Sequence, residues 1–269
     1  MFSALREILK DNWGWRGQIW HLAVVDIQKQ VRGTVLGWFW LIAKPLIFIV
    51  TLWFALEIGL RAERTVGDYP YILWLSLGLI GWFFMSSMIG SGSNVYKAYS
   101  YLIDKMRFPL SVISSFYGLA QLIIFLFTLL LPVIVMFILK VPFTIYALQM
   151  PFLIILMYLF FVFFSIMTSP VSALSKDFHN LIKAMQTPLM WFSGIIFNVE
   201  VIEFSWFKYV MLFNPITFFV YGFRAALCDH YWVWEKPETL IAFVGVFLLT
   251  LIVALVMYKR LGKEIPDVF

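Results

Sequence analysis

Charge is scarce in this sequence. Of its 269 residues only 13% are Asp, Glu, Lys or Arg, and 62% are hydrophobic, whereas soluble domains average about 25% charged and about 45–50% apolar residues. So few charges cannot hydrate the surface of a water-soluble protein of this length, which excludes a soluble globular domain. The formal net charge of +5 is better explained as an orientation signal in a membrane than as a nucleic-acid footprint. The composition predicts one membrane domain and no nucleic-acid partner.

Residues that carry chemistry are also few. Cys228 is the single cysteine, which excludes an intrachain disulfide and a cluster of thiolate metal ligands. The three histidines are far apart, and no HExxH, GxSxG or GxxxxGK[ST] motif occurs, so the sequence supports neither a zinc hydrolase, a serine hydrolase nor a Walker-type ATPase. We expect no catalytic residue, cofactor or metal ion on this chain.

The hydrophobic segments hold almost no ionisable residue away from their ends. Lys44 and Glu57 are the exceptions, and snorkelling or a position near a helix end explains them better than a proton relay. Ion-coupled carriers bury functional carboxylates or histidines in the bilayer. The sequence therefore disfavours a secondary transporter.

Long hydrophobic segments, in contrast, are abundant. About 20 mostly apolar residues cross about 30 Å of hydrocarbon, and six segments meet or nearly meet this requirement. They are Leu36–Leu60, Tyr69–Gly90, Leu110–Leu139, Met150–Leu174, Ala184–Val201 and Leu240–Tyr258. The sequence predicts an all-α, polytopic protein with six transmembrane helices.

Basic residues give the orientation. Most Lys and Arg residues fall in segments that share a side with the N-terminus, such as Lys97, Lys105, Arg107 and Lys259. Because short cytoplasmic loops carry the excess of Lys and Arg, we expect both termini in the cytoplasm and the chain in the cytoplasmic (inner) membrane.

The stretch between the fifth and sixth segments is unusual. It contains two apolar runs, Phe204–Phe213 and Ile216–Leu227, that are each too short to span a membrane. Asn214-Pro215 separates them, and a residue before proline is kept away from the helical region. We interpret this stretch as an extracellular re-entrant helical hairpin. The alternative, one long kinked span, gives seven crossings and places the basic C-terminal residues outside, against the charge bias.

Two segments outside the spans are amphipathic. Residues 1–32 alternate apolar and basic side chains at helical spacing, which is typical of a helix lying in the membrane interface. Residues 93–109 predict one short helix with Tyr99 and Leu102 on its apolar face. The predicted organisation is an interfacial segment over 1–32, a transmembrane domain over 33–261 and a cytoplasmic tail over 262–269.

Several short motifs now follow one another in a familiar order. They are Arg32-Gly33 with Leu36-Gly37-Trp38 and Trp40 before Pro45, then Lys105-Met106-Arg107-Phe108-Pro109-Leu110, then Lys176-Asp177, then Asn214-Pro215 followed by Phe218 and Arg224. In this order they resemble the membrane subunits of type 2 ABC exporters for teichoic acid, O-antigen and capsular polysaccharide. Lys176 departs from the arginine that many members have before the aspartate, which keeps the charge and loses a bidentate fork. Trp191, Ser193 and Gly194 look more similar to teichoic acid permeases.

The resemblance implies a permease that exports an undecaprenyl-linked polymer, with teichoic acid favoured and O-antigen or capsule as alternatives. It also implies that ATP and Mg are bound by two copies of a separate ABC ATPase, and that a second copy of this chain completes the channel. Membrane lipids surround the complex. A non-transport component of envelope polymer assembly is the alternative from another class.

Three groups of candidate site residues follow. The resemblance implies that the loop after the second span is a coupling helix seated on the ATPase, since its apolar residues would otherwise face water; the alternative is a solvated loop. The coupling residues are Tyr99, Leu102, Asp104, Lys105 and Arg107.

The basic and aromatic residues of the N-terminal segment suit an anionic lipid head group at the membrane surface. We predict that they guide the pyrophosphate-linked lipid, with plain anchoring as the alternative. These substrate-access residues are Arg6, Lys10, Trp13, Trp15 and Arg16.

The hairpin should line the outer end of the path, because irregular backbone at membrane depth persists only in protein or beside a water-filled cavity. The outer-gate residues are Asn214, Pro215, Phe218, Tyr221 and Arg224. We expect Arg224 to face that cavity or to pair with Glu200 or Glu203, the alternative being an arginine that snorkels to the outer headgroups.

Overall fold

A computed structural model describes residues 2–59, 65–66, 69–106, 108–199, 202–262 and 264–265. Its first half contains α1 (Phe2–Gly14), α2 (Arg16–Val31), α3 (Phe39–Trp53), η1 (Phe54–Gly59), β1 (Thr65–Val66), β2 (Tyr69–Pro70), α4 (Tyr71–Gly90), η2 (Gly92–Asn94), α5 (Val95–Ala98) and α6 (Ser100–Met106). Its second half contains α7 (Leu110–Thr128), α8 (Leu130–Ile138), η3 (Ile145–Gln149), α9 (Met150–Leu174), α10 (Lys176–Phe192), α11 (Ser205–Leu212), α12 (Pro215–Arg224), η5 (Ala225–Asp229), η6 (Val233–Glu235) and α13 (Pro237–Leu261). The two short strands pair antiparallel, Thr65 with Pro70 and Val66 with Tyr69, so the fold is helical apart from this ribbon.

Five helical stretches of the described residues are long and apolar enough to cross a membrane. They are Phe39–Gly59, Tyr71–Ala98, Leu110–Ile138, Ile145–Leu174 and Pro237–Leu261. Each overlaps one of the predicted spans, so the prediction of a polytopic all-α fold is confirmed. The third stretch is interrupted between α7 and α8, because Pro132 lacks the N–H that would bond the carbonyl of Thr128.

The predicted span Ala184–Val201 is placed differently. The helix found there is α10, Lys176–Phe192, whose 17 residues extend about 25 Å. Ser175 starts it by accepting a hydrogen bond from the backbone N–H of Phe178 at 3.3 Å, and the chain turns at Gly194, whose φ is +69°. The predicted span starts only at Ala184, because hydropathy does not recognise the polar first turns of α10. These turns are helical because Ser175 caps them.

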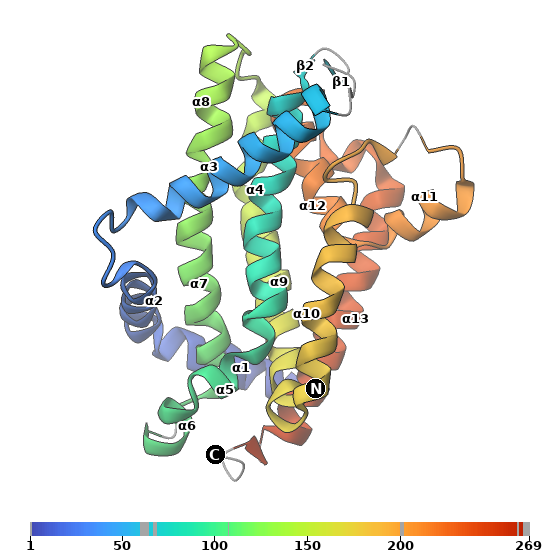
Figure 1. Cartoon of the computed structure of the whole chain (residues 1–269). Coiled ribbons are helices and arrows are strands. Elements are labelled where there is room, and N and C mark those ends of the chain that lie inside the picture. The colour runs from blue at the N-terminus through green and yellow to red at the C-terminus, as the bar shows by residue number, and fades with distance from the viewer. Residues whose placement is uncertain are drawn as a thin grey trace.

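Helices α11 and α12 enclose an angle of 89°, with Asn214 at the break. In Figure 1 both lie toward the end of the bundle opposite to α1 and α6. Helix α1 contacts α13, and Ala4 and Glu7 line a common pocket with Tyr258 and Lys259 near the end of α13. The first and last helices therefore meet at one end, as expected for an even number of crossings rather than seven. The five long helices become six crossings either with α10 or with the bent pair α11 and α12 as the further span, so the re-entrant hairpin stays a prediction.

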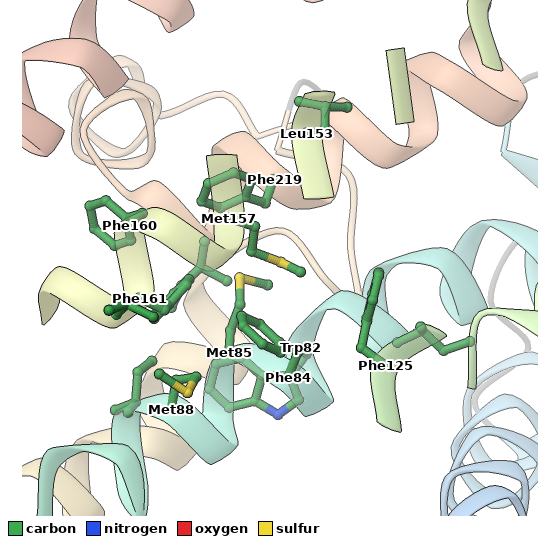
Figure 2. Packing of buried hydrophobic residues seen from close by; sticks show 14 of the residues in the cluster. Trp82, Phe84, Met85, Met88, Phe125, Leu153, Met157, Phe160, Phe161 and Phe219 are labelled. Carbon is green, nitrogen blue, oxygen red and sulfur yellow. The ribbon is translucent and has the colours of Figure 1, made fainter. Parts of the chain in front are cut away.

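Helix α4 is the centre of the bundle. In the most apolar stretch of 18 residues of each span, 78% is buried in the span that starts with α4, against 11% in the span that starts with α3 and 28% in α13. The outer helices therefore present their remaining apolar surface to lipid. Figure 2 shows Met85 and Met88 of α4 beside Met157 and Phe161 of α9; all four are at most 1% exposed. Many of the abundant aromatic residues thus pack the core, as in the edge-to-face contact of Phe84 and Phe161 with ring centroids 6.0 Å apart.

Candidate functional site

Helix α1 presents different residue types around its circumference. Ala4 and Ile8 are buried, and α1 packs against α7 and α13. Phe2, Leu9 and Trp13 are exposed and share another side of the helix, because their spacing of seven and four residues is close to whole turns. This apolar strip is what an interfacial helix inserts into the headgroup boundary.

Among the predicted substrate-access residues, Arg6, Lys10, Trp13 and Arg16 are exposed. The guanidinium carbon of Arg16 lies 5.1 Å from the centroid of the Trp13 ring. Trp15 instead turns inward and packs edge-on against Phe108, with centroids 4.6 Å apart. Four of the five side chains are therefore accessible to a ligand, whereas Trp15 holds the N-terminal helices against the segment before α7. Their role in substrate access stays a prediction.

A buried acid joins α2 to the loop between α4 and α7. Asp26 is 7% exposed, and the hydroxyl of Tyr99 donates a hydrogen bond to its carboxylate. One turn later Lys29 donates to the hydroxyl of Tyr101 at 3.4 Å. Burial, and then the hydrogen bond to Asp26, raise the pKa of Tyr99 well above its usual range, so the phenol remains a neutral donor. We call Asp26, Lys29, Tyr99 and Tyr101 the α2–loop junction.

The loop that holds the predicted coupling residues differs from the prediction in its helices and in the burial of Tyr99 and Leu102. The predicted single helix is three short pieces, η2, α5 and α6. Tyr99 is 8% and Leu102 is 5% exposed, because they pack inside this chain, with the Tyr99 ring 4.9 Å from that of Phe116. The expectation that these two would otherwise face water is therefore wrong.

The surface that this loop offers to a partner consists of other residues. Lys97, Tyr101 and Asp104 are exposed. Arg107 and the side chain of Lys105 lie outside the described residues, so their predicted contact with an ATPase stays a prediction. Among the described residues, Asp104 is the predicted coupling residue that points outward.

Two serines of α9 hold the start of this loop. Ser165 and Ser169 both donate to the backbone oxygen of Gly92, at 2.6 and 2.9 Å. The spacing of four residues between these two serines puts both hydroxyls on one face of α9. The hydroxyl of Ser165 also lies 3.0 Å from the hydroxyl of Ser114 of α7, from which it can accept a hydrogen bond. These hydrogen bonds attach the start of the loop directly to α9 and α7.

At the opposite end, α12 is fastened to the turn that follows α10. We call residues 193–199 the α10 turn. Asn214 caps α12 by accepting from the N–H of Ile216 at 3.0 Å, and its amide donates to Ser193 at 2.9 Å. Thr217 donates to the backbone oxygen of Ser193 at 3.2 Å. The hydroxyl of Tyr221 accepts from the N–H of Val199 at 2.8 Å.

Arg224 completes this attachment and lies in none of the predicted surroundings. It is 0% exposed and donates to three backbone oxygens, those of Trp74 at 3.2 Å, Gly194 at 2.7 Å and Ile195 at 2.7 Å. Its guanidinium carbon stacks 3.2 Å from the centroid of the Trp74 ring.

The expected acid partners of Arg224 are not found. Glu203 is exposed, and no ion pair joins it to Arg224 within the described part of the chain; Glu200 lies outside that part. A snorkelling arginine is excluded by the complete burial of the side chain. Three hydrogen bonds of the guanidinium reach two carbonyls of the α10 turn and one carbonyl of α4, so Arg224 clamps α12, the α10 turn and α4 together.

Room for the Arg224 clamp depends on Gly78 of α4. A Cβ at this position would lie 2.7 Å from a guanidinium nitrogen of Arg224 and 3.2 Å from the backbone oxygen of Ile195. Gly81, one turn later, similarly admits the ring of Phe223. A pair of glycines on one face of α4 thus lets α12 approach closely.

The remaining predicted gate residues border a small cavity of about 140 Å³ between α12, α11 and the start of α13. Phe218 and Tyr221 line it, and the ring of Phe218 also stacks on Phe243 with centroids 4.1 Å apart. Pro215 is the first residue of α12, where its missing N–H costs nothing. The cavity is too small for a polymer, and the role of these residues in an outer gate stays a prediction.

Sequence reasoning missed Asp26, Gly78 and Asn198. Asp26 is the one acidic residue of α2, among apolar and basic residues. An acid in such surroundings indicates a buried side chain that has a partner. Gly78 and Gly81 are three residues apart, which puts both on one face of a helix, and small residues on a helix face allow a close helix contact. Asn198 accepts from the hydroxyl of Tyr221 at 3.1 Å, and no local pattern announces that contact. No group of three or more metal-ligating side chains occurs within the described ranges.

Comparison with known proteins agrees with this architecture. Residues 17–228 match the family described as "ABC-2 type transporter". The "O-antigen export system permease protein RfbA" of Klebsiella pneumoniae is 24% identical over 261 residues, covering 94% of this chain and 96% of the relative. The protein of the same name from Myxococcus xanthus is 20% identical over 244 residues, covering 90% and 92%. The match extends from α2 through η5, and the chain therefore belongs to the ABC-2 type transporter family, as a multi-pass membrane subunit that works with an ABC ATPase.

Proposed function

We propose that this chain is the permease of an ATP-driven exporter of lipid-linked cell-envelope polysaccharide. The observation that carries the proposal is the near full-length similarity to relatives named as O-antigen export permeases. A helical bundle rich in packed aromatic residues, with few ionisable groups in its spans, is consistent with a path for a polymer that is moved by a separate motor rather than by ion coupling.

The polymer is proposed only as a class. Trp191, Ser193 and Gly194 look similar to teichoic acid permeases, but the matched relatives carry O-antigen names. In this structure Ser193 and Gly194 bind Asn214 and Arg224, so they serve packing within the chain and carry no information on the polymer. Teichoic acid, O-antigen and capsule remain alternatives, as does a non-transport role in polymer assembly.

The direction of the chain follows from its charges. We place the end with α1 and α6 in the cytoplasm, because it carries exposed Arg6, Lys10 and Lys97. An ABC ATPase would then contact the outward side chains of the loop, Tyr101 and Asp104, in two copies across a homodimer. The α2–loop junction would pass movement from that contact to the interfacial helices.

The hairpin would form the outer gate. The clamp of Arg224 holds α12 on α4 and the α10 turn, and these contacts would have to shift for a polymer to leave. Phe218 and Tyr221 border the closed cavity and would move with α12.

Depletion of the chain in its native host tests the function. We expect undecaprenyl-linked polymer to accumulate inside the cytoplasmic membrane while surface polymer falls, and a plasmid copy of the wild-type chain to reverse both changes. An equal fall of internal and surface polymer would instead support a role in polymer assembly.

A further inference from the structure

A polar groove opens in the side of the bundle, between α3 on one wall and α4 and α7 on the other. Its volume of about 370 Å³ lies within the range of about 300–1,000 Å³ of small-molecule sites. Helix α3 covers little of the bundle, since only 11% of the most apolar stretch of the span Phe39–Gly59 is buried. This leaves the groove open between α3 and its neighbours. Its apolar lining includes Trp40, Phe48, Phe83, Phe84 and Phe125.

Lys44 is the charged side chain among the residues that line the groove. It is the sixth residue of the span that starts at Phe39, which places its Cα about 8 Å into that span. It has no hydrogen-bond or ion-pair partner among the described residues. A lysine at membrane depth that faces a polar groove in the protein marks a functional site more often than one that faces lipid.

Gln121 of α7 faces the same groove from the opposite wall. This residue is 7% exposed, and within the described part of the chain no hydrogen bond satisfies its amide. Its amide atoms do not belong to the fully buried polar atoms that lack a partner in the described residues, so they are open to the groove. The amide therefore offers its donors and its acceptor to whatever occupies the groove.

The other polar side chains limit what that occupant is. Ser86 and Ser87 both donate to the backbone oxygen of Phe83, and Thr128 donates to that of Phe125. Gln30 of the groove donates one amide N–H to Asp26, which also accepts from Tyr99. The donors left on the lining are the ammonium group of Lys44, the amide of Gln121, the indole N–H of Trp40 and the second amide N–H of Gln30. Several donors with one positive charge match an anion with several acceptor oxygens.

From these contacts we propose that the Lys44–Gln121 groove binds the phosphate group of a membrane lipid, with the aromatic wall against the first part of its hydrocarbon. Two lipids share this chemistry, the polyprenyl phosphate of a transported substrate and an anionic phospholipid of the bilayer. The first source rests on the proposed function, and the second does not.

Equilibrium binding to the purified full chain in dodecyl maltoside, a phosphate-free detergent, tests the site. The probes are undecaprenyl phosphate, phosphatidylglycerol and, as the lipid without phosphate, diacylglycerol. Lys44→Gln should weaken binding of a phosphate lipid by about tenfold or more, the loss of one charge-assisted contact, and Gln121→Leu should weaken it by a smaller factor. Lys44→Arg keeps the charge and should retain most of the affinity. Lys140→Gln, an exposed lysine outside the groove, is the matched control and should leave binding unchanged.

The probes separate the two sources. Weakening confined to undecaprenyl phosphate identifies the lipid of a substrate, and weakening of both phosphate lipids identifies a general phospholipid site; both support a phosphate site. Wild-type affinity of Lys44→Gln and Gln121→Leu for both phosphate lipids overturns the proposal and leaves Lys44 as a snorkelling side chain. An equal loss for diacylglycerol also overturns it. If Lys44→Gln does not fold, Gln121→Leu decides: weaker binding of a phosphate lipid supports the site, and wild-type affinity overturns it. Because binding is measured without transport, a failed export assay leaves this result intact.

Discussion

At the scale of single residues, Arg224 shows how a charge is tolerated at membrane depth. Its guanidinium gains three carbonyl oxygens and the face of Trp74, contacts that replace the water it would lose. The side chain thereby connects three segments far apart in sequence, α4, the α10 turn and α12. Arg224 therefore serves a structural role in this fold.

Removal of that tie gives the first prediction. Arg224→Met leaves three carbonyls without their donor, at about 1–3 kcal/mol for each buried group that finds no other partner, so the melting temperature of the purified chain should fall strongly. Arg260→Met, an exposed arginine near the end of α13, serves as control and should melt like the wild type. Equal melting of the two variants would show that the clamp does not stabilise the fold.

The second prediction concerns Gly78. Gly78→Ala places a methyl group 2.7 Å from the Arg224 guanidinium and should destabilise the chain by about 1–3 kcal/mol, the cost of overpacking. Gly245→Ala has nothing within 4 Å of the new Cβ and should be neutral or stabilising by up to about 1 kcal/mol, since alanine favours helix. Chemical unfolding of both variants measures the difference, and a similar loss in both would point to a general effect of the methyl group instead.

At the scale of elements, the α2–loop junction binds a surface helix to the cytoplasmic loop through Asp26 and Tyr99. Asp26→Asn and Tyr99→Phe should each lower the free energy of unfolding by about 1.5–3 kcal/mol, the range for a hydrogen bond to a charged group. The double variant should lose less than the sum of the two, because both remove one contact. A double-mutant cycle checks this, and strict additivity would mean that the two residues act separately.

The burial of Tyr99 and Leu102 also changes how the loop is to be tested. Tyr101→Ala with Asp104→Lys alters the exposed face and should abolish ATP turnover stimulated by this chain in the complex. Melting should change little, because the contact of Tyr101 with Lys29 is long and exposed. Tyr99→Asp with Leu102→Asp puts two charges among buried side chains and should lower the melting temperature first. Normal turnover in the Tyr101/Asp104 variant would exclude this face as the ATPase contact.

The elements show what the sequence can predict. Five spans were recognisable because long apolar runs have one solution in a bilayer, and the break at Asn214-Pro215 followed from proline geometry. The limits of α10 were missed because Ser175 caps polar turns that hydropathy excludes. Tyr99 and Leu102 were assigned to the surface because periodicity shows an apolar face but not what covers it, which here is the chain's own Phe116 and α2.

At the scale of the whole molecule, the helices form a shell of lipid-facing apolar surface around α4, with α1 and α2 at one end and the hairpin at the other (Figure 1). The proposed ATPase contact thus lies at the end that carries the interfacial helices, the proposed gate lies at the other end, and α4, α7 and α9 connect the two ends. The partner of Arg224 could not be predicted from sequence, since Gly194 and Trp74 are brought to it only by the packing of three helices.

The central claim is that this chain forms an export path powered by a separate ATPase. It is tested most directly in proteoliposomes that contain the chain with its ABC ATPase, where lipid-linked polysaccharide loaded on one side is detected on the other by an external glycosidase. We expect glycan to become accessible only when ATP and both subunits are present, and the chain alone to show no ATP turnover. ATP hydrolysis by the chain alone, or glycan movement that needs neither ATP nor the ATPase, would contradict the account.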